Sequence, residues 1–340
     1  MAPRQALLGL MTGSDDLASG DTPSDGTREV EGKPARRWAA VSLRAAGTAA
    51  ILAFLLSRLD LDELATAMLR IGLWVWLATS AVQVLLHLLA ALKWRRLLNS
   101  CGLSVSGREG VRAHFAGLFA NIVLPSIVGG DAVRLGMVAR NGGRLAAAAT
   151  AGIADRATDV VALIVLSTLG GLFSSLDSVA ILILSYATGA VLLGIGLGVV
   201  ILRGLDAARL PARLAKAVQG LQLAIKDLSQ RKVAVAQAFA VALGMQSVLV
   251  LQNVLLGAAV GIDVPVSAWF VAWPLAKLVA LTPVSLGGLG VREGAMVVLL
   301  LPFGVDPNLA MAEALVWYSL IFTLGLIGGA ISGLLGRHTR

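Results

Sequence analysis

Long apolar stretches, each able to cross a lipid bilayer as a helix, limit what this chain can fold into. The hydrocarbon core of a bilayer is about 30 Å thick and needs roughly 20 apolar residues in a helix. Six stretches reach that length: 38–57, 71–92, 145–173, 179–202, 233–261 and 314–335. Charged residues make up only 14% of the 340 residues, too few to cover a soluble domain of this size. The sequence therefore predicts an all-α, polytopic membrane helix bundle.

Charge and motif content exclude several other classes of protein. The net charge of +8 would suit a nucleic-acid partner, but the basic residues stand at the ends of apolar stretches, where anionic lipid headgroups lie. Cys101 is the single cysteine, so neither a disulfide framework nor a thiolate metal site is expected. The sequence contains no Walker loop, nucleophile elbow or metal-ligand spacing. We therefore expect no cofactor, no metal, no nucleic-acid partner and no enzymatic activity.

The chain divides into a short polar segment and a long apolar one. Residues 1–37 carry acidic residues among Gly, Ser, Thr and Pro without apolar periodicity, and we interpret them as a disordered cytoplasmic tail. Residues 38–340 form the predicted integral membrane domain. Within it, 203–232 has apolar residues near helical spacing with basic residues between them. This pattern predicts an interfacial helix on the cytoplasmic leaflet, which links the two halves of the domain.

Two further apolar stretches, 114–138 and 266–301, are interrupted at their centres. The interrupting residues are Pro125, Gly129, Gly130, Pro283, Gly287, Gly288 and Gly290. Proline ends an incoming helix because it removes a backbone donor, and glycine admits tight backbone turns. We therefore expect each stretch to form a re-entrant hairpin of two half-length helices, alongside six full spans.

The distribution of basic residues supports this topology. Lysine and arginine precede the first span, follow the second, fill 203–232 and end the chain, whereas Asp263 and Asp306 flank the second interrupted stretch. With both stretches re-entrant, every loop agrees with cytoplasmic N- and C-termini in a bacterial-type inner (cell) membrane. If the interrupted stretches crossed the membrane completely, one cluster of basic residues would lie on the outer side of the membrane, against the positive-inside rule.

The two interrupted stretches are copies of one pattern. Residues 125–134 and 283–292 both read P-x3-GG-x2-V-R, and each follows two spans and precedes a third. The predicted repeats, about 38–173 and 179–336, are therefore inverted copies. Discontinuous helices at matching positions of inverted repeats indicate a binding site in the middle of the membrane. The alternative is that Pro and Gly only kink helices for packing.

Arginines of the repeated pattern are the first candidate binding residues. Arg134 and Arg292 lie one to two turns into the outgoing half-helices, whose N-termini present free N–H groups and the positive end of the helix dipole. Two such ends with two guanidinium groups would receive a phosphate or carboxylate. Glu293 would balance Arg292 or contact Arg134, and Asp131 is placed to cap its helix.

Charges deep in the third span form a second candidate group. Arg156 and Asp159 are three residues apart and can face the same side of a helix. Buried membrane charges face a bundle interior or a wet cavity, but a self-neutralising structural ion pair is equally consistent with the sequence. Lys277 would line the cavity or extend to the interface, and Lys93 is expected to be an interface anchor.

At these motifs the sequence resembles the lysylphosphatidylglycerol synthase transmembrane-region family, a group of flippase-like membrane domains. The matching pieces are N-I-V-L-P at 121–125, G-D-x-x-R at 130–134, D-R-x-x-D at 155–159 and P-x3-GG-x-G-V-x-E at 283–293. The family usually has Glu at the position of Asp155. The resemblance covers nearly all of 38–336 and implies a role connected with anionic or aminoacylated phospholipid. Because only 336–340 follow the last span, we expect a stand-alone member without the soluble synthase domain.

Three functions remain open from the sequence. The first is translocation of an anionic or modified phospholipid between leaflets, with the headgroup phosphate on Arg134 and Arg292 and with Arg156 and Asp159 lining the path. The second is secondary transport of a small anionic solute, coupled to protons through Asp159 or Glu293. The third is a non-transporting membrane partner of a lipid- or polysaccharide-synthesising enzyme; a homo-oligomer is also possible.

Overall fold

The computed structural model of the chain describes residues 62, 65–66, 69–124, 129–140, 145–174, 193, 196–198, 200–281 and 290–337. The predicted tail at 1–37, the span at 38–57 and most of the span at 179–202 lie outside these residues. So do four residues of the interrupting pattern, Pro125, Pro283, Gly287 and Gly288. The described residues form helices, turns and loops, and no β-strand occurs among them.

The helices follow the apolar stretches of the sequence. They are α3 (Leu73–Ser100), α4 (Gly107–Val123), α5 (Gly129–Arg140), α6 (Leu145–Leu172), α8 (Ala212–Gln230), α9 (Lys232–Val260), α10 (Val266–Val279), α11 (Val291–Leu300) and α12 (Pro307–Arg337). Of these, α3, α9 and α12 are long and apolar enough to cross a membrane. Helix α6 is as long as α3 but carries three charged residues near its middle. The all-helical membrane class predicted from the sequence is confirmed.

Local sequence signals set several helix ends. Helix α4 begins with a capping box, in which Ser106 Oγ accepts from the Glu109 N–H (3.2 Å) and Glu109 Oε2 accepts from the Ser106 N–H (3.0 Å). Helix α9 ends at Val260, and Gly261 after it has φ +102°, a conformation that favours glycine. Asp306 precedes α12, and its side chain accepts from the N–H of Asn308 at 2.7 Å.

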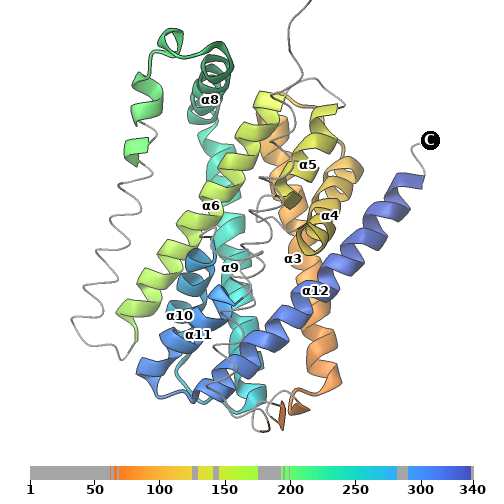
Figure 1. The fold of residues 1–340 in the computed structure, drawn as a ribbon, viewed down its shortest axis with the longest axis vertical. Helices are drawn as coiled ribbons and strands as arrows, with labels where there is room; N and C mark the ends of the chain where they lie inside the picture. Colours follow the sequence, from red (N-terminus) through yellow and green to blue (C-terminus); the bar gives the residue numbers. More distant parts are fainter. Residues whose placement is uncertain are drawn as a thin grey trace, which may run out of the picture. The chain divides into compact units, whose positions relative to one another are not determined.

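Both interrupted stretches consist of two shorter helices, as the prolines and glycines predicted. The first gives α4 and α5, and the second gives α10 and α11. In Figure 1, α4 and α5 lie toward the end where α3 finishes, whereas α10 and α11 lie toward the opposite end. In both cases the two short helices pack against each other. The short pairs therefore stand at corresponding places along the sequence and at opposite ends of the long helices.

Each half of the chain packs most extensively on the other half. Helix α4 packs on α12, and α10 packs on α6. The α4–α12 contact is close because glycines of α12 meet large side chains of α4: a Cβ at Gly325 would lie 2.8 Å from Ile122, and one at Gly329 would lie 2.7 Å from Phe119. Small residues at helix contacts are the usual means of association inside a membrane. Glycine at these positions therefore fixes how the two halves meet.

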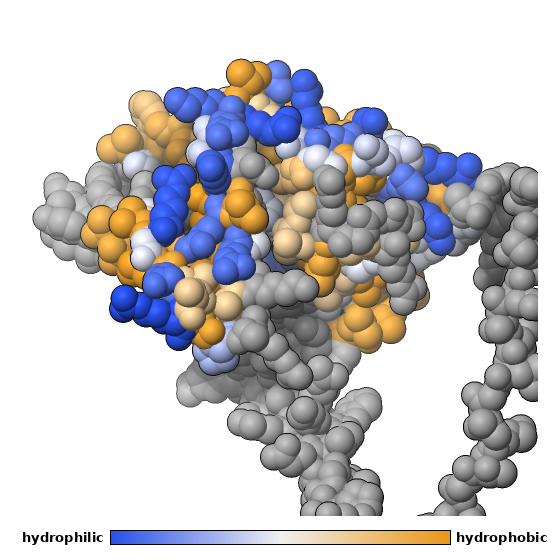
Figure 2. Space-filling view, turned by 90° about the horizontal axis from the view of Figure 1, so that it is seen from above, coloured by the Kyte–Doolittle hydropathy of each residue, from blue (hydrophilic) through white to orange (hydrophobic). Residues whose placement is uncertain are grey.

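One end of the described helices is rich in basic side chains. Figure 2 looks onto the end where α3 finishes and α8 lies, and hydrophilic residues gather there among apolar ones. The exposed basic residues of the segments at this end are Arg96, Arg108, Arg203, Arg209, Lys226, Arg231 and Lys232. At the other end, Asp263 and Asp306 are exposed in the loops before α10 and α12. The two ends of the helices thus differ in charge.

Candidate functional site

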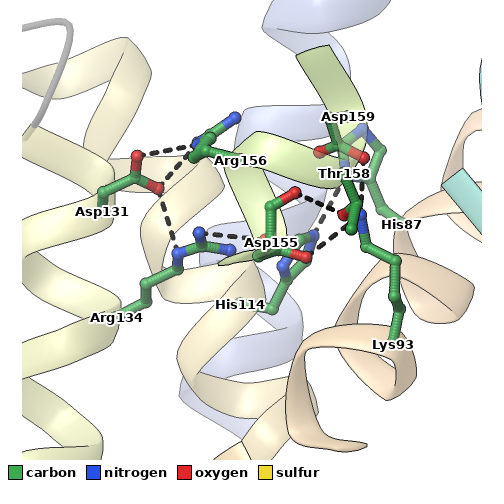
Figure 3. Close-up of polar contacts among 9 residues, drawn as sticks. All are labelled: His87, Lys93, His114, Asp131, Arg134, Asp155, Arg156, Thr158 and Asp159. Carbon is green, nitrogen blue, oxygen red and sulfur yellow. Dashed lines mark hydrogen bonds and ion pairs between the residues drawn. The ribbon is translucent and has the colours of Figure 1, made fainter. Parts of the chain in front are cut away.

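Six charged side chains from α3, α5 and α6 form a continuous chain of ion pairs (Figure 3). Cations and carboxylates alternate along it, three of each. In order of contact they are Asp159, Lys93, Asp155, Arg134, Asp131 and Arg156. Its middle members, Lys93, Asp155 and Arg134, are buried, and its last member, Arg156, is exposed. This chain of ion pairs is the centre of the candidate site.

Lys93 is the most deeply buried member. Its Nζ lies 3.1 Å from Asp155 Oδ1 and 2.5 Å from Asp159 Oδ1, and its side chain is 1% exposed. The two carboxylates are one helical turn apart on α6, so both can reach one ammonium. Lys93 therefore joins α3 to α6 through two ion pairs.

Arg134 of α5 lies between two carboxylates. Its Nη2 is 3.1 Å from Asp155 Oδ2, and its Nε is 3.0 Å from Asp131 Oδ1. The guanidinium Cζ also lies 4.7 Å from the centre of the Trp94 ring, which is completely buried. Stacking on an aromatic face adds to the attraction of the carboxylates when the cation is removed from water. Two carboxylates and one aromatic ring therefore hold the Arg134 guanidinium in place.

Arg156 is the exposed end of the chain. Its Nε and Nη2 donate to the two oxygens of Asp131 at 3.0 and 2.7 Å, a bidentate pair. Its side chain is nevertheless 52% exposed, although Arg156 is the twelfth of the 28 residues of α6. The charged chain therefore opens to the molecular surface near the middle of a long apolar helix.

Glycine at position 130 brings α5 close enough to supply Asp131 and Arg134. The Gly130 N–H donates to Asn121 Oδ1 of α4 at 2.9 Å. A Cβ at Gly130 would lie 2.3 Å from that oxygen and from the carbonyl oxygen of Gly117, so no larger residue fits without a shift. Gly130 thus has a direct structural purpose, because the absence of a side chain there allows α5 to lie close to α4.

Charge balance makes such a chain tolerable between apolar helices. Removing an ion from water costs several kcal/mol, about what close opposite charges can return when their geometry is good. Each inner member here has two opposite partners, so no isolated buried charge remains in the chain. In such a site an external phosphate or carboxylate can take the place of an internal carboxylate on an arginine, because both satisfy the same bidentate geometry.

Two histidines lie beside the charged chain. His87 Nδ1 of α3 and His114 Nε2 of α4 are 3.1 Å apart, and the ring centres are 5.4 Å apart (Figure 3). One ring must donate and the other accept, so the pair is satisfied with a single proton between these two nitrogens. The contact joins α3 to α4 on the inner side of the site.

The second half of the chain contributes a smaller ionic group. Arg292 Nη2 pairs with Glu293 Oε1, and Glu293 Oε2 accepts from the Gly290 N–H at 2.7 Å at the start of α11. Lys277 of α10 donates to Gln246 Oε1 at 2.9 Å. Lys277 Nζ and Arg292 Cζ lie 6.0 and 5.9 Å from the centre of the same indole ring, that of Trp273. Lys277 also interacts electrostatically with Asp159 of the first group and with Arg292 of the second.

Several sequence predictions are corrected by this geometry. Asp131 does not cap its helix: it is the third residue of α5, and its carboxylate pairs with two arginines. Arg156 pairs with Asp131 rather than with Asp159, because tertiary packing brings α5 beside α6. Lys93 is a buried partner of two aspartates and not an interface anchor.

For Glu293, the structure agrees with one of the two alternatives given by the sequence. Glu293 balances Arg292, and Arg134 has its own partners on the other side of the site. Arg134, Arg156, Asp131 and Asp159 are brought together, whereas Arg292 and Glu293 form a separate pair. Among the residues that the structure describes, no group of His, Cys, Asp and Glu has the arrangement of a metal site.

Sequence reasoning missed Lys93, His114 and Glu313 as members of polar sites. For Lys93 and His114 no local signal exists, since each looks like a residue at the edge of an apolar stretch. For Glu313 a signal does exist: it follows Arg292 by 21 residues, the same distance by which Asp155 follows Arg134.

Long apolar helices and a buried, charge-balanced chain between them define an integral membrane protein. The family model for the lysylphosphatidylglycerol synthase TM region matches residues 39–329. The chain therefore belongs to that family, a family of membrane domains related to lipid modification or transport. A comparison with curated proteins gives no match.

Proposed function

We propose that the protein binds an anionic phospholipid by its headgroup phosphate within the membrane and moves the lipid between the two leaflets. The observation that carries this proposal is Arg156. At a rise of 1.5 Å per residue it lies roughly 16 Å from the first residue of α6, the helix that we propose as the third span. A half-exposed guanidinium at that depth is costly in hydrocarbon and needs an anionic or wet neighbour outside the protein.

A headgroup phosphate would take the place that Asp131 now holds on Arg156. The bidentate geometry of the Arg156–Asp131 pair is one that phosphate oxygens also satisfy. Displacing Asp131 would free one side of Arg134, which is the next cation inward. Because Arg156 is at the surface of the bundle, the acyl chains would stay in hydrocarbon while the phosphate moves along the charged residues. Asp159 would line the inner part of the path.

The arrangement of the helices supports a mechanism with alternating access. We propose six spans and two re-entrant hairpins, α4–α5 and α10–α11, in an inverted repeat. The supporting observations are the shared sequence pattern, the placement of the short pairs at opposite ends, and the packing of each pair on a long helix of the other half. Rocking of one repeat against the other would offer the headgroup to each leaflet in turn. Arg292 would then receive the phosphate on the side of the second hairpin.

The charge difference between the ends of the helices supports one orientation. The basic end, with α8 and the C-terminal end of α12, would face the cytoplasm of a cell with an inner membrane. In this orientation α8 lies on the anionic cytoplasmic leaflet. Both termini would be cytoplasmic, and the proposed activity needs no chemical step.

The test is a leaflet-exchange assay in proteoliposomes. Phosphatidylglycerol and phosphatidylcholine would each carry a fluorophore on an acyl chain, so that the headgroups stay native, and an impermeant reductant would bleach the outer leaflet. Wild type should expose the anionic probe beyond the half that is bleached in empty liposomes. Arg156→Gln should abolish this exposure. The matched control is Arg209→Gln, an exposed arginine paired with an aspartate three residues earlier.

Three outcomes would contradict the proposal or narrow it. Exchange that matches empty liposomes, with folded protein present, rejects lipid translocation and leaves uptake of a small anionic solute to be measured next. Equal exchange of both probes rejects selection for a net anionic headgroup, since phosphatidylcholine also carries a phosphate but has no net charge. Exchange that survives Arg156→Gln rejects the path through the charged chain.

A further inference from the structure

Glu313 is a buried carboxyl group outside the charged chain. It lies on α12, which packs against α11, and it is completely buried. Neither of its carboxyl oxygens has a hydrogen-bond partner in the structure, and no ion pair reaches it among the described residues. An ionised carboxylate in such a place would cost several kcal/mol. The group therefore needs either a cation or a proton.

The internal repeat shows which cation Glu313 matches. The shared pattern places Arg292 at the position of Arg134, and the same offset of 158 residues places Glu313 at the position of Asp155. In the first half, Arg134 Nη2 is 3.1 Å from Asp155 Oδ2. In the second half, the corresponding arginine pairs with Glu293 instead. By its position in the repeat, Glu313 is therefore the carboxyl group expected to pair with Arg292, but in the structure Arg292 pairs with Glu293 instead.

The charge count of the second half explains why a proton is required. Arg134 also faces two carboxylates, Asp131 and Asp155, but these carboxylates have further partners in Arg156 and Lys93. At the same offset, Ala314 and Leu251 stand where Arg156 and Lys93 stand in the first half, and Lys277 donates to Gln246 and forms no ion pair with Glu293 or Glu313 among the described residues. Arg292 is therefore the cation near Glu313, and while it pairs with Glu293 a proton is needed on Glu313.

The two carboxyl groups differ in how well they tolerate a charge. Glu293 is in the first turn of α11, where the N–H of Gly290 and the positive end of the helix dipole stabilise an anion. Glu313 is in the interior of α12 and has no such donor. The charged groups near enough to act on Glu313 from the helices packed against α12 are Arg292 and Glu293. The proton therefore belongs on Glu313 while Arg292 pairs with Glu293.

We propose that Glu313 is a proton-binding site and that Arg292 alternates between Glu293 and Glu313 as the second hairpin moves. When Arg292 turns to Glu313, the carboxyl group releases its proton to water at the membrane surface and becomes the anionic partner. Glu293 then stays ionised on the Gly290 N–H and the α11 N-terminus. When Arg292 returns to Glu293, Glu313 binds a proton again. One proton is bound and released in each cycle.

This exchange would couple proton movement to the lipid movement proposed above, and only that coupling depends on the proposed function. The exchange uses residues on two helices that pack together, α11 and α12. The exchange of partners also distinguishes Arg292 from Arg134. Arg134 is held in place by Asp131, Asp155 and Trp94 together. The second half of the repeat would thus add proton binding to the binding of the headgroup phosphate.

Infrared difference spectroscopy tests proton binding without any transport. Membranes containing the wild-type protein should show a protonated carboxylic acid band at neutral pH that is lost in Glu313→Gln. The band should also be lost in Glu293→Gln, although Glu313 is intact, because Arg292 then has Glu313 as its remaining carboxyl partner. A band that persists in Glu313→Gln overturns the proposal. So does a band that persists in a folded Glu293→Gln protein, which rejects the exchange of partners.

A second measurement tests coupling. In the leaflet-exchange assay, a pH gradient should change the wild-type rate several-fold, and Glu313→Gln should exchange lipid at a rate that ignores the gradient. Arg209→Gln should respond as wild type does. If wild type exchanges no lipid while the infrared band behaves as expected, the proposed function fails and proton binding stands. If lipid is exchanged but the wild-type rate ignores the gradient, coupling through Glu313 is rejected.

Discussion

Replacing Lys93 with methionine isolates the electrostatic part of the buried chain, because methionine keeps most of the apolar stem. The change removes two ion pairs at 3.1 and 2.5 Å from a side chain that is 1% exposed. Breaking a buried pair from one side costs about 3–5 kcal/mol. Asp155 keeps Arg134, and Asp159 is partly exposed, so the lower end applies. We expect Lys93→Met to lower the free energy of unfolding by about 3 kcal/mol.

The double variant Lys93→Met with Asp159→Asn separates charge from packing. It leaves two arginines and two aspartates in the chain of ion pairs, so the positive and negative charges are again equal in number. We expect it to recover about 2 kcal/mol relative to the single variant, because residues in one network are coupled. Reversible denaturation in mixed detergent micelles, followed by tryptophan fluorescence, measures both changes.

The control for this series is the exposed pair of Arg209 and Asp206. Arg209→Ala should change stability by no more than about 0.5 kcal/mol, because exposed ion pairs contribute little. The reasoning is wrong if Lys93→Met costs less than about 1 kcal/mol, well below the cost of stranding a buried charge. It is also wrong if the double variant is less stable than the single one, since stability would then follow the number of polar contacts rather than charge balance.

Three further predictions follow from single contacts. Gly130→Ala should destabilise the protein by about 1–3 kcal/mol in the same assay, because its Cβ would lie 2.3 Å from a backbone oxygen of α4, whereas Gly136→Ala, with open space around it, should not. Arg156→Lys should slow exchange of the anionic lipid about tenfold by losing the bidentate fork; a wild-type rate would refute a role for that geometry. An impermeant maleimide should label Cys101 only in inside-out vesicles. In a Cys101→Ser background, it should label the cysteine of Asp263→Cys only in right-side-out vesicles. The reverse pattern of labelling would invert the proposed orientation.

Where helices form and where they break could be predicted from the sequence because these are local properties. An apolar run of about 20 residues predicts a spanning helix whatever its neighbours are. Pro125 and Pro283 predicted the breaks between α4 and α5 and between α10 and α11. The periodic apolar residues of 203–232 predicted α8. None of these inferences required knowledge of tertiary contacts.

Partners within the site could not be predicted, because they depend on which helices meet. Lys93 looked like the end of a span at residue 92, but α3 continues to Ser100, so the lysine is inside the helix and faces α6. Arg156 and Asp159 looked like a local pair three residues apart. In the structure each turns to a different helix, Arg156 to α5 and Asp159 to α3.

Asymmetry between the two halves is the feature from which a working mechanism follows. Hairpins with the same pattern place Arg134 and Arg292 at equivalent positions, yet the first is surrounded by a balanced set of charges and the second shares one cation between two carboxyl groups. In the first set, a headgroup phosphate would take a carboxylate's place on an arginine without a change of protonation. In the second set, the proposed change of partner by Arg292 would change the protonation of Glu313. A symmetric pair of sites would bind anions at both ends of the path but would have no means of sensing a proton gradient, whereas the proposed pair would gain one through Glu313.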